Sequence, residues 1–116
     1  EEMYARARSI TPDDVVFRQM RASVYLTFGM LEQAESDLQV ALAAKPEDPI
    51  TWYELASVYE LRGQIGEAID ALEKVDLLAT EANLIEMSAT ARIRRGMLMQ
   101  QVGVREQTLS TATPIP

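Results

Sequence analysis

The chain has 116 residues, a net charge of −7, and neither cysteine nor histidine. This length fits one domain or part of one, and a hydrophobic content of 47% argues against disorder. Without cysteine or histidine the chain lacks disulfides, thiol nucleophiles, the usual zinc ligands and the commonest general base. We therefore expect no catalytic residue, metal site or cofactor.

The negative charge is concentrated in the middle of the chain. Residues 32–86 carry thirteen acids and three bases, a net −10, whereas residues 87–116 carry one acid and four arginines, a net +3. Because an acidic surface repels the phosphate backbone, we expect no nucleic-acid binding. No window approaches the roughly 18 continuous apolar residues of a membrane-spanning helix, so no membrane span is expected.

Residues 1–12 resemble the end of a structural unit. A shift of 34 residues places this segment on the stretch that ends near residue 46. We therefore expect it to be the second helix of a truncated preceding repeat, in a fragment of a longer array. The matched pairs are Tyr4 with Leu38, Ala7 with Ala41, and Pro12 with Pro46.

Two segments, residues 14–28 and 49–62, place apolar side chains at helical spacing. Asp48 before Pro49, and Thr11 before Pro12, predict N-caps with proline in the first turn. A glycine follows each segment and suits the left-handed position that ends a helix. Second helices are expected from Leu31 and Ile65. The repeat pairs are Ala22 with Ala56, Tyr25 with Tyr59, Gly29 with Gly63, Ala34 with Ala68, and Leu38 with Leu72.

The small repeated residues predict how each pair of helices packs. Ala22 with Ala34, and Ala56 with Ala68, would let the two helices of a hairpin approach closely. Larger side chains would then fill the gaps between neighbouring hairpins, namely Tyr25, Trp52 and Tyr59.

Beyond residue 80 the repeat register slips by six residues. We expect a single longer helix over residues 81–102, capped by Thr80, that shields the end of the array. Residues 105–116 contain Ser, Thr and two prolines with little to bury, so a flexible tail is expected there.

The period and these positions resemble the tetratricopeptide repeat, whose pattern runs Trp, Leu, Gly, Tyr, then Ala, Phe and Pro. Residues 49–82 match best, with Trp52, Leu55, Ala56, Tyr59, Ala68 and Leu72. Residues 15–48 keep Ala22, Tyr25, Ala34, Leu38 and Pro46. The departures are Thr80 in the slot of the closing proline, and Arg18 and Arg21 where apolar residues are usual. The resemblance implies an all-α fold, an α–α superhelix of antiparallel hairpins.

The resemblance also implies a concave groove, lined by the first helix of each hairpin, that binds a peptide or helix of a partner protein. The implied groove residues are Gln19, Met20, Ser23, Thr27, Ile50, Tyr53, Glu54, Ser57, Glu60, Leu61 and Arg94. Val16, Leu26, Thr90, Ile93 and Met97 lie at neighbouring groove positions.

Members of the family that hold acidic chaperone tails use a clamp of Lys, Asn and Arg. Of the matching positions here, only Arg94 carries a suitable side chain, and Glu54 and Glu60 would repel a carboxylate. A basic or mixed apolar partner is therefore favoured over an acidic one. The remaining clamp positions hold Gln19, Ser23, Glu54 and Thr90.

Other charged residues have plainer interpretations. The run of Arg92, Arg94 and Arg95 is expected to pair with nearby carboxylates. The acids on outer helix faces are expected to serve solubility. These acids are Glu32, Glu35, Asp37, Glu67, Asp70 and Glu73.

Three functions remain open for the chain. The first is a non-catalytic scaffold or adaptor that binds a partner protein during complex assembly. The second is a self-association module that drives homo-oligomer formation, and the third is a regulatory appendage of a larger protein. Localisation is open, with the cytoplasm as the default, because the chain does not begin with Met and a targeting segment could precede it.

Overall fold

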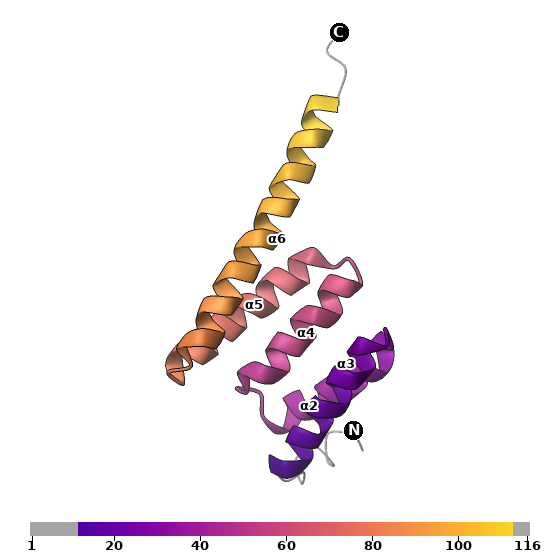
Figure 1. Ribbon diagram of the computed structural model, residues 1–116, viewed down its shortest axis with the longest axis vertical. Coiled ribbons are helices and arrows are strands. Elements are labelled where there is room, and N and C mark those ends of the chain that lie inside the picture. Colours follow the sequence, from indigo (N-terminus) through magenta and orange to yellow (C-terminus); the bar gives the residue numbers. More distant parts are fainter. Residues whose placement is uncertain (1–11, 113–116) are drawn as a thin grey trace.

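The computed structural model describes the backbone of residues 12–112 and the side chains of residues 14–103. Within these residues the fold is all-α, as predicted, and the helices follow one another in antiparallel order (Figure 1). The expected second helix of a preceding repeat falls almost wholly outside the described residues. The helices are α2 (Pro12–Thr27), α3 (Leu31–Ala44), α4 (Pro49–Leu61), α5 (Ile65–Glu81) and α6 (Ile85–Ala112).

Two hairpins, α2–α3 and α4–α5, stack side by side, and α6 packs along α5. The core consists of one apolar cluster within and between the hairpins and a second between α4, α5 and α6. Trp52 and Tyr59 contact both clusters, which confirms that they fill the gap between neighbouring hairpins. The first cluster holds Ala22, Ala34, Leu38, Leu55 and Val58. The second holds Ala56, Ala68, Ala71, Leu72, Val75, Ala91 and Leu98.

The two glycine turns have the same geometry. Gly29 and Gly63 have φ angles of 72° and 78°, in the left-handed region that costs glycine least. In each turn the amide after the glycine donates to the carbonyl five residues earlier, as in a Schellman motif. The N–O distance is 2.8 Å both from Met30 to Tyr25 and from Gln64 to Tyr59. The prediction of left-handed glycines is therefore confirmed.

A third turn of this kind lies where none was predicted. α5 continues through Glu81, and α6 begins at Ile85. Between them Asn83 adopts a φ of 64°, and the Leu84 amide donates to the Ala79 carbonyl at 2.7 Å. Thr80 lies inside α5, so the prediction that it caps a helix over residues 81–102 was wrong.

α6 also ends later than predicted. It runs to Ala112 and projects beyond the ends of α4 and α5 (Figure 1). The expectation of a flexible tail was therefore wrong for residues 105–112, whereas residues 113–116 lie outside the described part. Extending an existing helix adds one hydrogen bond per residue without a new nucleus, so a polar sequence can continue it.

Asp48 positions the start of α4, as predicted. Its carboxylate accepts a hydrogen bond from the Ile50 amide at 3.0 Å, and Pro49 occupies the first turn. The indole N–H of Trp52 donates to the Pro46 carbonyl at 2.9 Å and holds the α3–α4 loop against the helix. Among the described residues, no helix is both long and apolar enough to cross a membrane.

Candidate functional site

Two stripes of side chains lie on α2 and α4. All members on α2 are exposed, whereas on α4 the end members Ile50 and Leu61 are exposed and the middle two are half-buried. The spacing i, i+4, i+7, i+11 places each stripe along one helix face. Equivalent members are 34 residues apart, so the stripes occupy the same position on neighbouring hairpins. Four large apolar members are 43% to 65% exposed: Val16, Met20, Ile50 and Leu61. We call them the paired stripes: Val16, Met20, Ser23 and Thr27 on α2, and Ile50, Glu54, Ser57 and Leu61 on α4.

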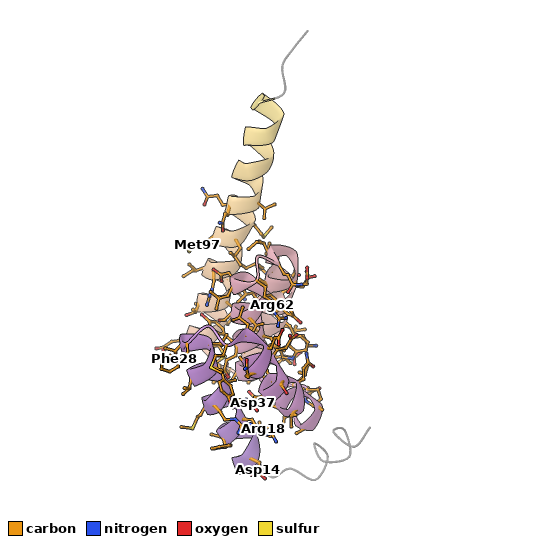
Figure 2. The ribbon with its side chains drawn as sticks, turned by 90° about the vertical axis from the view of Figure 1, so that its right-hand side faces the viewer. Asp14, Arg18, Phe28, Asp37, Arg62 and Met97 are labelled. Carbon is orange, nitrogen blue, oxygen red and sulfur yellow. The ribbon has the colours of Figure 1, made fainter. Side chains whose placement is uncertain are left out.

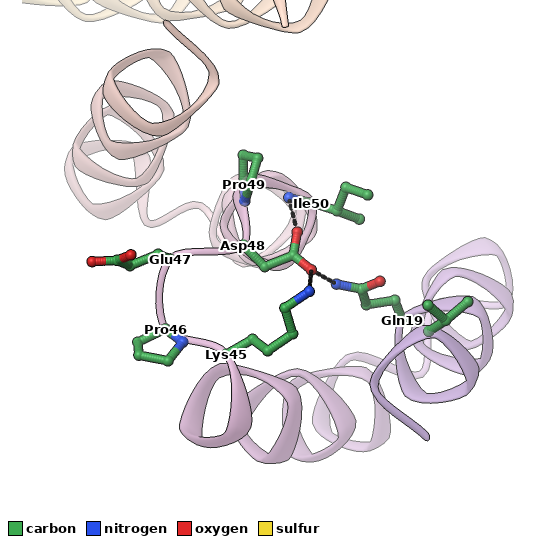
Figure 3. A pocket seen from close by; sticks show the side chains of 8 residues that line it. Gln19, Lys45, Pro46, Glu47, Asp48, Pro49 and Ile50 are labelled. Carbon is green, nitrogen blue, oxygen red and sulfur yellow. Dashed lines mark hydrogen bonds and ion pairs between the residues drawn. The ribbon is translucent and has the colours of Figure 1, made fainter. Parts of the chain in front are cut away.

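A pocket of about 620 Å³ opens at the beginning of the paired stripes (Figure 3). Val16 and Ile50 contribute apolar wall, and the α3–α4 loop contributes the rest. Among the lining residues, Asp48 accepts hydrogen bonds from both the Ile50 amide and Gln19, and it forms an ion pair with Lys45. The complete lining is Val16, Gln19, Lys45, Pro46, Glu47, Asp48, Pro49 and Ile50.

Gln19 belongs to the packing between hairpins and not to an open groove surface. Its side chain is 5% exposed, and its amide nitrogen donates to Thr51 Oγ1 at 2.9 Å and to Asp48 Oδ2 at 3.0 Å. Lys45 Nζ lies 3.9 Å from the same Asp48 oxygen. The expectation that Gln19 offers a free side chain to a partner was wrong, because these bonds join α2 to α4.

Tyr53, Glu60 and Arg94 form a cluster that holds α6 against α4. Arg94 donates to Glu60 Oε1 from Nε at 3.0 Å and from Nη2 at 2.6 Å. Its guanidinium lies over the Tyr53 ring, 5.6 Å from the centroid. The charge of Glu60 is therefore paired with Arg94 within the chain.

Glu54 has no such partner. Its Oε1 is the one buried side-chain polar atom in the described residues without a hydrogen bond. Burial and then the negative charge of Asp48 raise the pKa of the Glu54 carboxyl to about 7. Nearby hydroxyls bond to their own helices, with Ser57 Oγ donating to the Tyr53 carbonyl at 3.4 Å and Thr27 Oγ1 to the Ser23 carbonyl at 3.0 Å.

The two arginines that depart from the repeat pattern have a partner on α3. Arg21 donates to both oxygens of Asp37, at 2.8 and 2.6 Å, and Arg18 donates to Oδ1 at 3.1 Å. Arg18 and Asp37 are labelled beside one another in Figure 2. Asp37 is buried, so its assignment to a solubilising outer face was wrong. Its burial depends on partners in a different helix, which no local pattern reveals.

The arginine run on α6 pairs with carboxylates, as predicted. Arg92 Nε lies 2.9 Å from Asp76 Oδ2, and Arg94 is bound to Glu60. Arg95 Nη1 lies 3.9 Å from Glu73 Oε1. Among the described residues no group of three or more His, Cys, Asp or Glu side chains could hold a metal ion.

A second apolar surface lies beside the stripe of α2, on the adjoining helix face. Phe17, Val24 and Phe28 are 53% to 74% exposed. In the 34-residue register, Phe17 and Val24 correspond to Thr51 and Val58, which are buried where α4 meets the preceding hairpin. We call Phe17, Val24 and Phe28 the outer face of α2. The Arg21 guanidinium lies over the Phe17 ring, 5.5 Å from its centroid, and Val24 and Phe28 remain open to solvent.

Comparison with known proteins supports the resemblance to the tetratricopeptide repeat. The searches of curated proteins and of solved structures found no match to the chain. A family model described as "Tetratricopeptide repeat" matches residues 50–81, which coincide with the α4–α5 hairpin. The α4–α5 hairpin is therefore similar to a tetratricopeptide repeat, a unit that suggests a protein-interaction module.

Proposed function

We propose that the paired stripes bind a segment of a partner protein and that the chain acts as a non-catalytic scaffold or adaptor. The observation that supports this is the exposure of Val16, Met20, Ile50 and Leu61 in one register on neighbouring helices. Apolar surface left in water forgoes about 25 cal/mol per Å² of stabilisation. Contiguous exposed apolar surface on a folded protein commonly marks an interaction site.

The charges around the stripes favour a basic or mixed apolar partner. Glu54 is the only ionisable member of the paired stripes. The pocket at their beginning adds Glu47 and Asp48 against the single cation Lys45. Opposite charge on the partner would steer association and suppress acidic competitors.

The test is affinity capture from lysate of the source cells, followed by a direct binding measurement with the purified partner. Met20→Glu and Leu61→Glu each place a charge on one stripe and should weaken binding at least tenfold. Leu77→Glu is the matched control, because Leu77 is similarly exposed but lies on α5 outside the stripes. Equal loss in all three variants, or in none, would contradict the proposal.

The outer face of α2 supports self-association as a second candidate. Phe17 and Val24 are exposed, although their equivalents in α4, Thr51 and Val58, are buried. A dimer burying this face should show a mass that rises with concentration in light scattering. Phe17→Ser with Phe28→Ser should return it to a monomer, whereas Leu61→Ser, on the α4 stripe, should not. A mass of one chain at every concentration would exclude this candidate.

A further inference from the structure

We infer that Glu54 is the point at which the paired stripes recognise charge, accepting the side chain of a Lys or Arg in the partner. An apolar side chain of the same segment would enter the pocket between Val16 and Ile50. This inference rests on the proposed function and names the partner chemistry that the stripes would select.

The first argument is the missing donor. A buried carboxylate oxygen without a hydrogen bond is costly, and the other acids around the stripes avoid this cost. Asp48 accepts from the Ile50 amide and from Gln19, and Glu60 accepts twice from Arg94. Glu54 Oε1 has no donor within the described residues. A ligand N–H placed against the Glu54 carboxyl would supply the donor that the described residues do not.

The second argument is that the donor should be a cation. Glu54 lies within residues 32–86, which carry a net charge of −10, and Asp48 adds its negative field at the same site. A neutral donor would satisfy the oxygen but leave this field unbalanced. A Lys or Arg side chain does both, because hydrogen bonds between ionised groups are about twice as strong as neutral ones.

The third argument is the spacing of the two contacts. Ile50 lines the pocket, and Glu54 follows it by one helical turn. Residues four apart on a helix have Cβ atoms about 5–6 Å apart. Alternate residues of an extended segment, about 6.6 Å apart, can match that distance, as can residues three or four apart in a helix. The partner motif is thus an apolar residue with Lys or Arg two to four positions away.

The experiment uses the full chain labelled with ¹⁵N and a set of amidated nonapeptides. Each peptide carries one Leu and one Lys, two, three or four residues apart, in an Ala/Ser background. Matched peptides replace Lys by norleucine or by Glu. Amide shifts of Ile50 and Glu54 give the dissociation constants. We expect at least one Lys peptide to bind about tenfold more tightly than its norleucine analogue.

Two variants isolate the carboxylate. Glu54→Gln keeps the shape of the side chain and should remove the preference for Lys. Glu67→Gln removes an exposed acid on α5, outside the paired stripes and the pocket, and should retain that preference. Circular-dichroism melts would establish that both variants are folded. Glu54→Lys should reverse the order and favour the Glu peptide.

The inference is overturned if Glu54→Gln keeps the preference for Lys or if no Lys peptide binds better than its analogue. The proposed function fails separately. If norleucine peptides bind and Leu61→Glu abolishes that binding, the stripes bind apolar segments without using Glu54. If Leu61→Glu and Met20→Glu change neither peptide binding nor partner capture, the paired stripes are not the binding surface.

Discussion

Gln19 of α2 donates a buried hydrogen bond to Thr51 of α4 across 2.9 Å, and its amide also reaches the carboxylate of Asp48. Asp48 caps α4, so one side chain joins the body of the first hairpin to the start of the second. The residues flanking this network, Val16 and Ile50, are the first members of the paired stripes. The relative position of the two stripes therefore depends on a polar contact in the core.

Gln19→Leu should destabilise the fold by about 1–3 kcal/mol, because it leaves the buried Thr51 hydroxyl without its donor. Urea denaturation measures the change. Gln33→Leu is the control, since Gln33 is exposed on α3 and surface substitutions usually stay within about 0.5 kcal/mol.

The double variant Gln19→Leu, Thr51→Val should recover part of the loss, because it removes both polar partners. If Gln19→Leu unfolds at the same urea concentration as the wild type, the bond does not hold the hairpins together.

Asn83→Gly should stabilise the chain by up to about 1 kcal/mol. Asn83 has a φ of 64°, and only glycine adopts that region without a steric cost from Cβ. Asn83→Ala should destabilise by about the same amount. Thermal melts of the two variants would test the order Gly, Asn, Ala, and an Ala variant as stable as Gly would show that the turn is not left-handed.

The same residue shows where sequence reasoning reached its limit. Gly29 and Gly63 marked two of the turns, because glycine at the end of an apolar helical pattern strongly favours a left-handed C-cap. Asn83 is also compatible with a helix interior, so the periodic pattern predicted continuous helix across the third turn. Identifying that turn would have required weighing Asn as a left-handed C-cap.

The candidate site was predictable to a similar degree. The resemblance to the tetratricopeptide repeat implied Met20, Ile50 and Leu61 as groove residues, and all three are exposed. The bonding of Gln19 to Thr51 and of Arg94 to Glu60 joins residues 32 and 34 positions apart. Such pairs depend on the distance and rotation between helices, which a periodic pattern does not specify.

Glu54 should make stability fall as the pH rises from about 4.5 to about 8. The folded pKa is about 7, above the ordinary value of 4.5, so between these values the folded state binds more protons than the unfolded state. The contribution of the Glu54 carboxyl to the free energy of unfolding is therefore complete below the unfolded pKa. It is lost as the pH rises through the folded-state pKa. Allowing for partial exposure, the loss should be about 1–2 kcal/mol.

Glu54→Gln measures this contribution, because glutamine does not titrate. The difference in unfolding free energy between the two proteins should shift in favour of the glutamine variant as the pH rises from about 5 to about 8. Gln33→Ala, at an exposed position without a titrating group, is the control and should show no such shift. A difference that is constant with pH would mean that Glu54 titrates alike in both states.

Asp76 should have the opposite effect. The hydroxyl of Ser88 donates to Asp76 at 2.6 Å, and Arg92 donates to both of its oxygens. Ser88 first, and then Arg92, hold the pKa of Asp76 below its usual value. A lowered folded pKa means that the stabilisation is present above the unfolded pKa, near 4, and is lost as the pH falls through the folded value.

Ser88→Ala should therefore cost more stability at about pH 7 than at about pH 3, because at the lower pH much of the carboxylate's advantage has already gone. Thr90→Ala is the control, because its hydroxyl donates to the Glu86 carbonyl within α6. Urea melts of the three proteins at both pH values give the comparison. An equal loss of stability at both pH values would mean that Ser88 contributes packing and not its hydrogen bond to the Asp76 carboxylate. The network joins two helices, because Asp76 lies on α5 and Ser88 on α6. A loss confined to neutral pH would instead make this charge network a determinant of how α6 sits on the second hairpin.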